Sequence, residues 1–289
     1  MTQQSDKLID CMARLKAAAI PFALVTVVRT QDLTSAKAGA KAVVQADGAL
    51  DGWIGGGCNQ AAARRAARAA LADGQPRMIR VRPNAVPGQI VAGAEEQPSG
   101  CPSGGTTELF VEPILPRPSL IVLGASPCAQ AVARLGVGAG YAVTLSAAAQ
   151  DQARLEASGL LPEVCFLPDF QVCRAAPGAA VVVATQGKGD AAALKAALRL
   201  DSGYCAFVGS RRKADRLTES LQDDATLRPA LDRLRSPAGL DIGARTPEEI
   251  ALSILAELVV WRSGKAVDPA LAGAQRRPGG PSKTPGPKG

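Results

Sequence analysis

A cysteine follows three consecutive glycines in WIGGGCNQ, residues 53–60. Glycines leave the backbone bare, so its N–H groups can approach an anion or a flat ligand closely. Cys58 stands where an alanine-rich helix is expected to begin, from about residue 59 to residue 71, and a helix N-terminus favours a thiolate. The stretch fits both a ligand site and a tight turn beside a small buried cysteine. The three glycines are Gly55, Gly56 and Gly57.

A second loop of the same kind lies in SGCPSGGTTELF, residues 99–110, where Cys101 precedes Gly104 and Gly105. Two such loops in one small domain predict a shared cleft. The chain contains no histidine, which excludes Ser-His and Cys-His nucleophile pairs, His-ligated zinc and the commonest general base. Most hydrolytic chemistry is therefore disfavoured, and ligand binding beside a thiol is the better hypothesis.

Cationic side chains crowd a predicted helix start in VGSRRKADRL, residues 208–217. If Ser210 caps this helix, three cations occupy its first turn, where the dipole disfavours each of them by roughly 0.3–1 kcal/mol. A bound anion would remove that cost, and a solvated surface is the alternative interpretation. The three cations are Arg211, Arg212 and Lys213.

Two further loops of the second half carry charged residues between glycines. TQGKGD, residues 185–190, holds Lys188 and ends in Asp190, a predicted helix cap. This loop follows a predicted strand, and ligands of open α/β sheets bind at the carboxyl ends of strands. GLDIGA, residues 239–244, holds Asp241 and precedes a helix whose start Thr246 and Glu249 mark as a capping box. Both loops are candidate ligand contacts.

Short apolar runs mark the strands that would position these loops. The first half predicts a small mixed α/β domain, with strands at residues 21–29, 40–46, 77–82 and 106–112. The second half alternates apolar strands with helical stretches, which predicts a Rossmann-like, doubly wound parallel sheet. Cys165 is expected on a core strand of that sheet. The strands are predicted at residues 120–124, 141–146, 163–168, 179–185 and 204–209.

Three prolines in EPILPRPS interrupt the chain and predict a domain boundary there. The predicted parts are a domain of residues 1–116, a Rossmann-like domain of residues 117–263 and a disordered basic tail of residues 264–289. The tail is rich in Pro and Gly and carries a large share of the net charge of +7. With aromatic residues at 3%, a nucleic-acid-binding surface is poorly supported.

Other features bear on location and cofactor. No apolar run approaches the roughly 20 residues that cross a bilayer, and the chain start lacks a signal peptide, so a cytoplasmic protein is expected. The seven cysteines are scattered without a CxxC pair, which indicates free thiols. The first turn of the second domain, LGASPCAQ, departs from a dinucleotide fingerprint because Ser126 and Ala129 replace its later glycines. Ser146, at the end of the next predicted strand, cannot replace a ribose-binding carboxylate.

Six segments, taken together, resemble the XdhC/CoxF (XdhC/CoxI) family of accessory proteins for molybdenum hydroxylases. The likeness covers roughly residues 20–262. The CPSGG spelling and the SP-containing turn are nearest the CoxF type, which is associated with carbon monoxide dehydrogenase gene clusters. In chain order the segments are VVRT, DGWIGGGCNQ, CPSGGTTELFVEP, VVVATQGKGD, FVGSRRK and PAGLDIGARTPEEIALSILAE.

The resemblance implies a maturation factor without turnover of its own, which binds the molybdenum cofactor (molybdopterin) transiently and supports its sulfuration and insertion. This cofactor is an anionic pterin dithiolene that carries a phosphate. Cys58 is then the first candidate contact, with the metal reached through the cofactor, and Cys101 is the second. The expected partners are the target hydroxylase, a cysteine desulfurase and a second copy of the chain. The alternatives are an NAD(P)-dependent oxidoreductase and a cofactor-free scaffold between desulfurase and hydroxylase.

Overall fold

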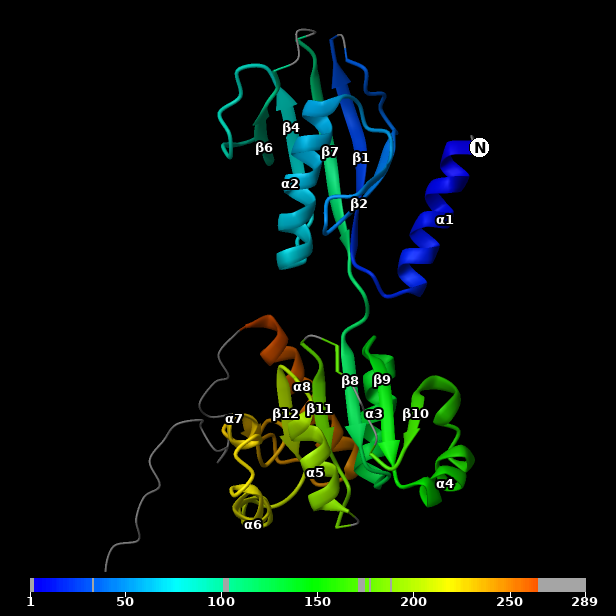
Figure 1. Ribbon diagram of the computed structural model, residues 1–289, viewed down its shortest axis with the longest axis vertical. Helices are drawn as coiled ribbons and strands as arrows, with labels where there is room; N and C mark the ends of the chain where they lie inside the picture. The colour runs from blue at the N-terminus through cyan, green and yellow to red at the C-terminus, as the bar shows by residue number, and fades with distance from the viewer. Residues whose placement is uncertain are drawn as a thin grey trace, which may run out of the picture. The chain divides into compact units, whose positions relative to one another are not determined.

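The computed structural model describes residues 3–32, 34–100, 104–170, 175–176, 178–187 and 189–264. The chain divides into two compact units, Met1–Pro116 and Arg117–Gly289 (Figure 1). Cys101, Lys188 and the tail from residue 265 lie outside the described residues, so the predictions made for them stay predictions. No helix of the described ranges is long and apolar enough to cross a membrane.

The N-terminal unit is built on a mixed seven-stranded sheet in the order β3-β2-β1-β7-β4-β6-β5. Only β4 and β6 run parallel, and the other neighbours are antiparallel. The four strands expected from the sequence are present, and the structure adds the short strands β3, β5 and β6. The bounds are β1 Phe22–Gln31, β2 Lys41–Gln45, β3 Leu50–Gly52, β4 Arg77–Arg82, β5 Ile90–Val91, β6 Ala94–Pro98 and β7 Thr106–Ile114.

Two helices cover opposite faces of this sheet, because side chains alternate along its strands. Helix α2, Gly57–Asp73, packs a row of buried alanines against the face that carries Ala23 and Val25 of β1. Helix α1, Gln3–Ala17, packs against Phe22 and Val43 on the other face. Figure 1 shows both helices beside their strands. The small alanine side chains let α2 pack closely on the sheet. The glycine loop of residues 55–57 leads into the start of this helix.

The C-terminal unit confirms the predicted Rossmann-like, doubly wound parallel sheet. Its six strands follow the order β10-β9-β8-β11-β12-β13, and all neighbours are parallel. The chain reverses its direction of travel between β8 and β11, which is where such folds bind ligands. The bounds are β8 Ser119–Leu123, β9 Ala142–Ala147, β10 Cys165–Pro168, β11 Ala180–Val183, β12 Tyr204–Phe207 and β13 Leu234–Arg235.

Helices cover both faces of this second sheet. On one face lie α3 and α8, and α8 begins with the capping box of Thr246 and Glu249 that its sequence indicates. The prediction that Cys165 lies on a core strand is wrong. It begins β10, which has a neighbour on one side only, and its side chain is exposed. The helix bounds are α3 Pro127–Gly138, α4 Gln152–Ala157, α5 Asp190–Arg199, α6 Arg211–Leu221, α7 Arg228–Leu231 and α8 Pro247–Ser263.

Candidate functional site

The glycine loop of residues 55–57 connects the region of β3 with α2, and its three glycines differ in what the fold requires. Gly55 has a φ of +105°, and a Cβ there would lie 2.6 Å from Asn59 Nδ2 and 3.1 Å from the Ala36 Cβ. This position therefore needs glycine. A Cβ on Gly56 would approach only Ser35 Oγ, at 3.8 Å, and one on Gly57 would meet nothing within 4 Å. The bare backbone at these two positions is not demanded by packing.

The amide groups at the start of α2 are available, whereas the carbonyl groups before them are used. Asn59 Nδ2 donates to Ile54 O at 3.0 Å, and Gln60 Nε2 donates to Gly55 O at 3.2 Å. Within the described residues, the N-cap Gly56 has no side-chain cap and the first turn holds no acidic residue. The first N–H groups of α2 therefore lack a capping side chain, and the positive end of the dipole is uncompensated.

Cys58 lies beside these amides. Helix α2 begins at Gly57, two residues earlier than expected, so Cys58 is the second residue of its first turn. Its side chain is half-buried and packs against the alanine-rich core of the N-terminal unit. Cys58 therefore combines the two interpretations that the sequence left open: part of the thiol contacts the core and part remains accessible.

The segment 34–36 brings the two glycine-containing loops to one end of the sheet. Ala36 contacts Gly55, and Thr34 Oγ1 lies 3.4 Å from Thr107 Oγ1. Thr107 is the second residue of β7, two residues after Gly105, and Gly104 has a φ of +71°. Figure 1 shows the starts of α2 and β7 at the same end of the N-terminal unit. The structure thus places Gly104 and Gly105 near the first loop, while Cys101 is outside the described residues.

An ion-pair network under this end was missed by the sequence reasoning. The fully buried Glu96 carboxylate of β6 pairs with Arg80 at 3.2 Å and with Arg82 at 2.5 Å. Arg80 also pairs with Glu108 of β7 at 2.9 Å. The network holds β6 in register where it leads into the second loop, since Ser99 N–H donates to Arg82 O at 2.9 Å. The alternating arginines of RMIRVR were the available signal.

In the C-terminal unit, the cationic turn opens α6 as predicted, with the Lys213 N–H donating to the Ser210 hydroxyl at 3.4 Å. The Lys213 ammonium, however, is paired with the Asp190 carboxylate. Arg211 and Arg212 are exposed, and no ion pair to either occurs among the described residues. The predicted anion contact is therefore reduced to the two arginines.

Asp190 is the internal anion of this turn, and its predicted role as a helix cap is wrong. The N-cap of α5 is Gly189, and Asp190 is the first residue of the helix. The Asp190 carboxylate accepts hydrogen bonds from the Thr185 hydroxyl and, at 3.0 Å, from Gly187 N–H. Burial would raise the pKa of Asp190, but the Lys213 ion pair and these hydrogen bonds outweigh burial and lower it. Two loops at neighbouring strand ends are thereby held together.

The remaining candidate of this unit, Asp241, is exposed. Its loop is anchored at Gly239, whose N–H donates to Glu257 at 2.8 Å. The buried Glu257 carboxylate also binds Tyr204 Oη and Arg235 Nη1, both at 2.8 Å. These hydrogen bonds fix the base of the loop. No contact of the Asp241 side chain occurs among the described residues, so its predicted role stays a prediction.

The first turn of the Rossmann-like domain is filled by the chain itself. Gly124 has a φ of +129°, and a Cβ there would lie 2.7 Å from the Ala184 carbonyl carbon. Ser126 caps α3 and donates to Ala184 O at 2.5 Å. Arg154 donates to Ala125 O at 3.1 Å, beside a cavity of only about 60 Å³. Ser126, which replaces a fingerprint glycine, therefore helps to close this turn against β11.

Two family models match the chain. The model described as the XdhC and CoxI family matches residues 15–82, and the model described as the XdhC Rossmann domain matches residues 120–258. The two matches fall in the two units and together span most of the described residues. The chain belongs to the XdhC and CoxI family.

Two curated relatives and one solved structure are similar to the chain. "Uncharacterized protein YqeB" of Escherichia coli is 27% identical over 93% of this chain and 48% of its own length. A protein of Bacillus subtilis, named as a probable xanthine dehydrogenase subunit, is 31% identical over 56% of this chain and 48% of its own length. The chain thus spans about half the length of the curated relatives it matches. A solved structure described as a xanthine dehydrogenase from Bacillus halodurans has a TM-score of 0.45 at 20% identity, covering 91% of this chain and 99% of its own.

Proposed function

We propose that this protein is an accessory factor that binds the molybdenum cofactor and supports its sulfuration and insertion into a molybdenum hydroxylase. The target is of the xanthine dehydrogenase or carbon monoxide dehydrogenase type, and the protein has no turnover of its own. Family membership supports the proposal, as does the name of the Bacillus subtilis relative. The proposal includes a cytoplasmic location, a cysteine desulfurase as a second partner and a closer relation to the CoxF type.

The observation that carries the proposal is the start of α2. Gly56 and Gly57 are bare where packing does not require it, the first N–H groups lack an acceptor among the described side chains, and Cys58 stands beside them. Backbone amides at a helix N-terminus suit a phosphate or another anionic group. A cysteine sulfur is a soft ligand suited to a metal–sulfur centre. These residues therefore fit an anionic ligand that carries such a centre.

Each group has a separate task in this proposal. The amides of Gly56 and Gly57 would hold the anionic part of the cofactor, and the Cys58 thiol would be a soft ligand for its metal–sulfur centre. When bound, the cofactor supplies the metal–sulfur chemistry that the hydroxylase requires. Within the C-terminal unit, Arg211 and Arg212 are separate candidate anion contacts, because neither has a carboxylate partner among the described residues.

Cofactor retention tests the proposal. The purified protein is incubated with cofactor released from a molybdenum hydroxylase, desalted, and analysed for molybdenum and phosphorus per chain. The Cys58→Ala variant should lose most of the retained molybdenum. It should fold normally, because alanine keeps the Cβ that packs against the core and only the half-buried thiol is removed. Cys165→Ala is the matched control, since Cys165 is also a free thiol but lies on an edge strand.

The outcomes separate the competing functions. Equal retention by the parent, Cys58→Ala and Cys165→Ala would show that Cys58 is not a contact. A parent that retains no molybdenum, but still binds the hydroxylase, would be the cofactor-free scaffold. Saturable binding of NAD(P)H without cofactor retention would identify the oxidoreductase alternative, which the filled turn at Gly124 and Ser126 disfavours.

A further inference from the structure

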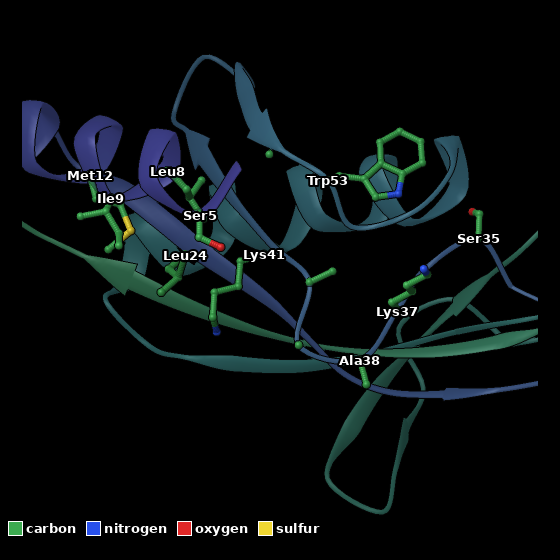
Figure 2. A pocket seen from close by; sticks show the side chains of 13 residues that line it. Ser5, Leu8, Ile9, Met12, Leu24, Ser35, Lys37, Ala38, Lys41 and Trp53 are labelled. Atoms are coloured by element: carbon green, nitrogen blue, oxygen red, sulfur yellow. The ribbon is translucent and has the colours of Figure 1, made fainter. Parts of the chain in front are cut away.

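A second feature of the N-terminal unit, a cavity of about 880 Å³, lies between α1, the strands β1 and β2, and the segment before α2 (Figure 2). It belongs to the sheet face opposite α2. Its volume falls within the range of roughly 300–1,000 Å³ that is usual for small-molecule sites. Ligand cavities combine an apolar lining with a few placed polar groups, and the lining of this cavity has that character.

The two ends of the cavity differ in chemistry. Ile9 and Met12 of α1, with Leu24 of β1, give one end a mostly apolar lining, and Lys41 also lies near this end (Figure 2). Trp53 and Lys37 lie toward the other end, where Figure 2 shows both away from the α1 side chains. Trp53 is 47% exposed and Ile9 is 51% exposed. Large apolar side chains that remain exposed around a hollow indicate a surface that a ligand covers.

The charged groups of the lining have one sign. Lys37 and Lys41 line the cavity, and no carboxylate does so among the described lining residues. Lys41 Nζ donates to the Thr26 hydroxyl at 2.9 Å. Lys37 forms no ion pair within the described part of the chain, so its ammonium is available. Lysines and an indole that line the same cavity suit a ligand that is both flat and negatively charged.

The cavity also adjoins the glycine loop. Trp53 precedes Gly55 by two residues, and Ser35, another lining residue, lies beside Gly56. The backbone turns there from the cavity into α2. A single ligand of moderate length can therefore contact the cavity and the amides of the glycine loop together.

We propose that this cavity binds the conjugated ring system of an anionic heterocycle, which stacks on Trp53 and places a negative group toward Lys37. The proposal concerns a site distinct in residues from Cys58 and the α2 amides. The identification of the ring as the pterin of the molybdenum cofactor rests on the proposed function. The binding of a flat conjugated anion is inferred from the residues of the cavity alone.

The probe is 6-carboxypterin, a conjugated anion without metal or phosphate, titrated by calorimetry and by tryptophan fluorescence. The chain has two tryptophans, and the Trp261→Phe variant leaves Trp53 as the single reporter. We expect saturable quenching of Trp53 in this background. Inorganic phosphate at the same concentration should not quench it, because phosphate has no ring to stack.

Matched variants localise the binding. Trp53→Ala and Lys37→Met should each weaken 6-carboxypterin binding about tenfold or more, since stacking and a charge-assisted contact are lost. Ile90→Ala removes an exposed apolar side chain of the same unit outside the cavity, and Lys16→Met removes an exposed cation of α1. Both controls should bind as the parent does. Circular dichroism and unfolding midpoints establish that every variant folds.

Cofactor retention by the same variants distinguishes this inference from the proposed function. If the parent retains cofactor and Trp53→Ala and Lys37→Met do so equally, with unchanged 6-carboxypterin binding, the cavity assignment is overturned and the function stands. If the parent retains no cofactor but binds 6-carboxypterin through Trp53 and Lys37, the function fails and the cavity remains a site for another conjugated anion. Absence of saturable 6-carboxypterin binding at millimolar concentration also overturns the assignment.

Discussion

Helices α2 and α3 both begin after a turn that contains glycine, and the two turns are built differently. Each places a cysteine at the second helical position, Cys58 in α2 and Cys128 in α3. At α3, the Ser126 hydroxyl caps the helix and the turn packs against Ala184. At α2, the N-cap is Gly56 and no side chain of the described residues caps the helix. Ser126 thus accepts a hydrogen bond from one first-turn amide of α3, that of Ala129, whereas no described side chain accepts one at α2.

The largest expected effect comes from adding a methyl group to each turn. Gly124→Ala should lower the free energy of unfolding of the C-terminal unit by about 3 kcal/mol or more, because the new Cβ strains a left-handed residue and collides with Ala184.

Gly57→Ala should instead raise the free energy of unfolding of the N-terminal unit by up to about 1 kcal/mol, since alanine is the better helix former. Urea unfolding of each variant measures both changes.

The Gly57→Ala variant also tests the ligand side of the comparison. Its added methyl group meets nothing in the protein, but it would lie where a bound ligand approaches the amides. Cofactor retention should therefore fall although stability does not. A variant that is stabilised and retains cofactor like the parent would contradict the placement of the ligand at α2.

The half-buried cysteine of the α3 turn should also differ from a surface thiol. Burial raises the pKa of the Cys128 thiol to about 11, and the Glu248 carboxylate adds to the shift. Only the thiolate reacts, and its fraction falls tenfold for each unit by which the pKa exceeds the pH. At pH 8, only about one Cys128 side chain in 1,000 is therefore a thiolate. Iodoacetamide should label Cys128 much more slowly than the exposed Cys165, as measured by mass spectrometry. Comparable rates would show that the start of α3 is more open than the structure indicates.

The internal anion of the α6 turn has a measurable pH dependence. The Asp190 pKa is lower in the folded protein, so its stabilisation is present above the unfolded value of about 3.9 and is lost as the pH falls through the folded value. At pH 7, Asp190→Asn should lower the free energy of unfolding by about 2 kcal/mol. The difference from the parent should shrink below about pH 4. Asp241→Asn, at an exposed position, is the control and should change little at either pH.

The smallest expected effect concerns the two arginines that Asp190 does not neutralise. Arg211→Gln with Arg212→Gln should leave the cofactor-free protein as stable as the parent or slightly more stable, because the helix dipole disfavours these cations. The same variant should bind cofactor about tenfold more weakly, or about 1.4 kcal/mol, and its affinity should respond less to salt. Titrations at low and moderate ionic strength measure both, with Arg216→Gln of the next turn as control. If the double variant binds cofactor with the parent's affinity and salt response, Arg211 and Arg212 are solvated surface residues and not anion contacts.

Local signals in the sequence were sufficient for much of the fold. The strand–helix alternation of the second half predicted the doubly wound sheet, because buried parallel strands are continuous apolar runs. The capping box at Thr246 and the helix start at Ser210 were readable because caps depend on residues three positions apart. Short strands such as β5 and β6, and the exposure of Cys165 on an edge strand, were not readable, since they depend on which neighbours a segment acquires.

The order of residues along the chain is enough to specify which groups stand at helix starts, including Cys58 after its glycines and the three cations that open α6. Which of these groups stay free depends on the folded chain. Lys213 is neutralised by Asp190, and the turn at Gly124 is closed by Ala184, through contacts between segments distant in the chain. Caps and turns are local, whereas pairing and packing depend on how strands are ordered in a sheet. For that reason the open amides of α2 and the cavity beside Trp53 emerge only in three dimensions.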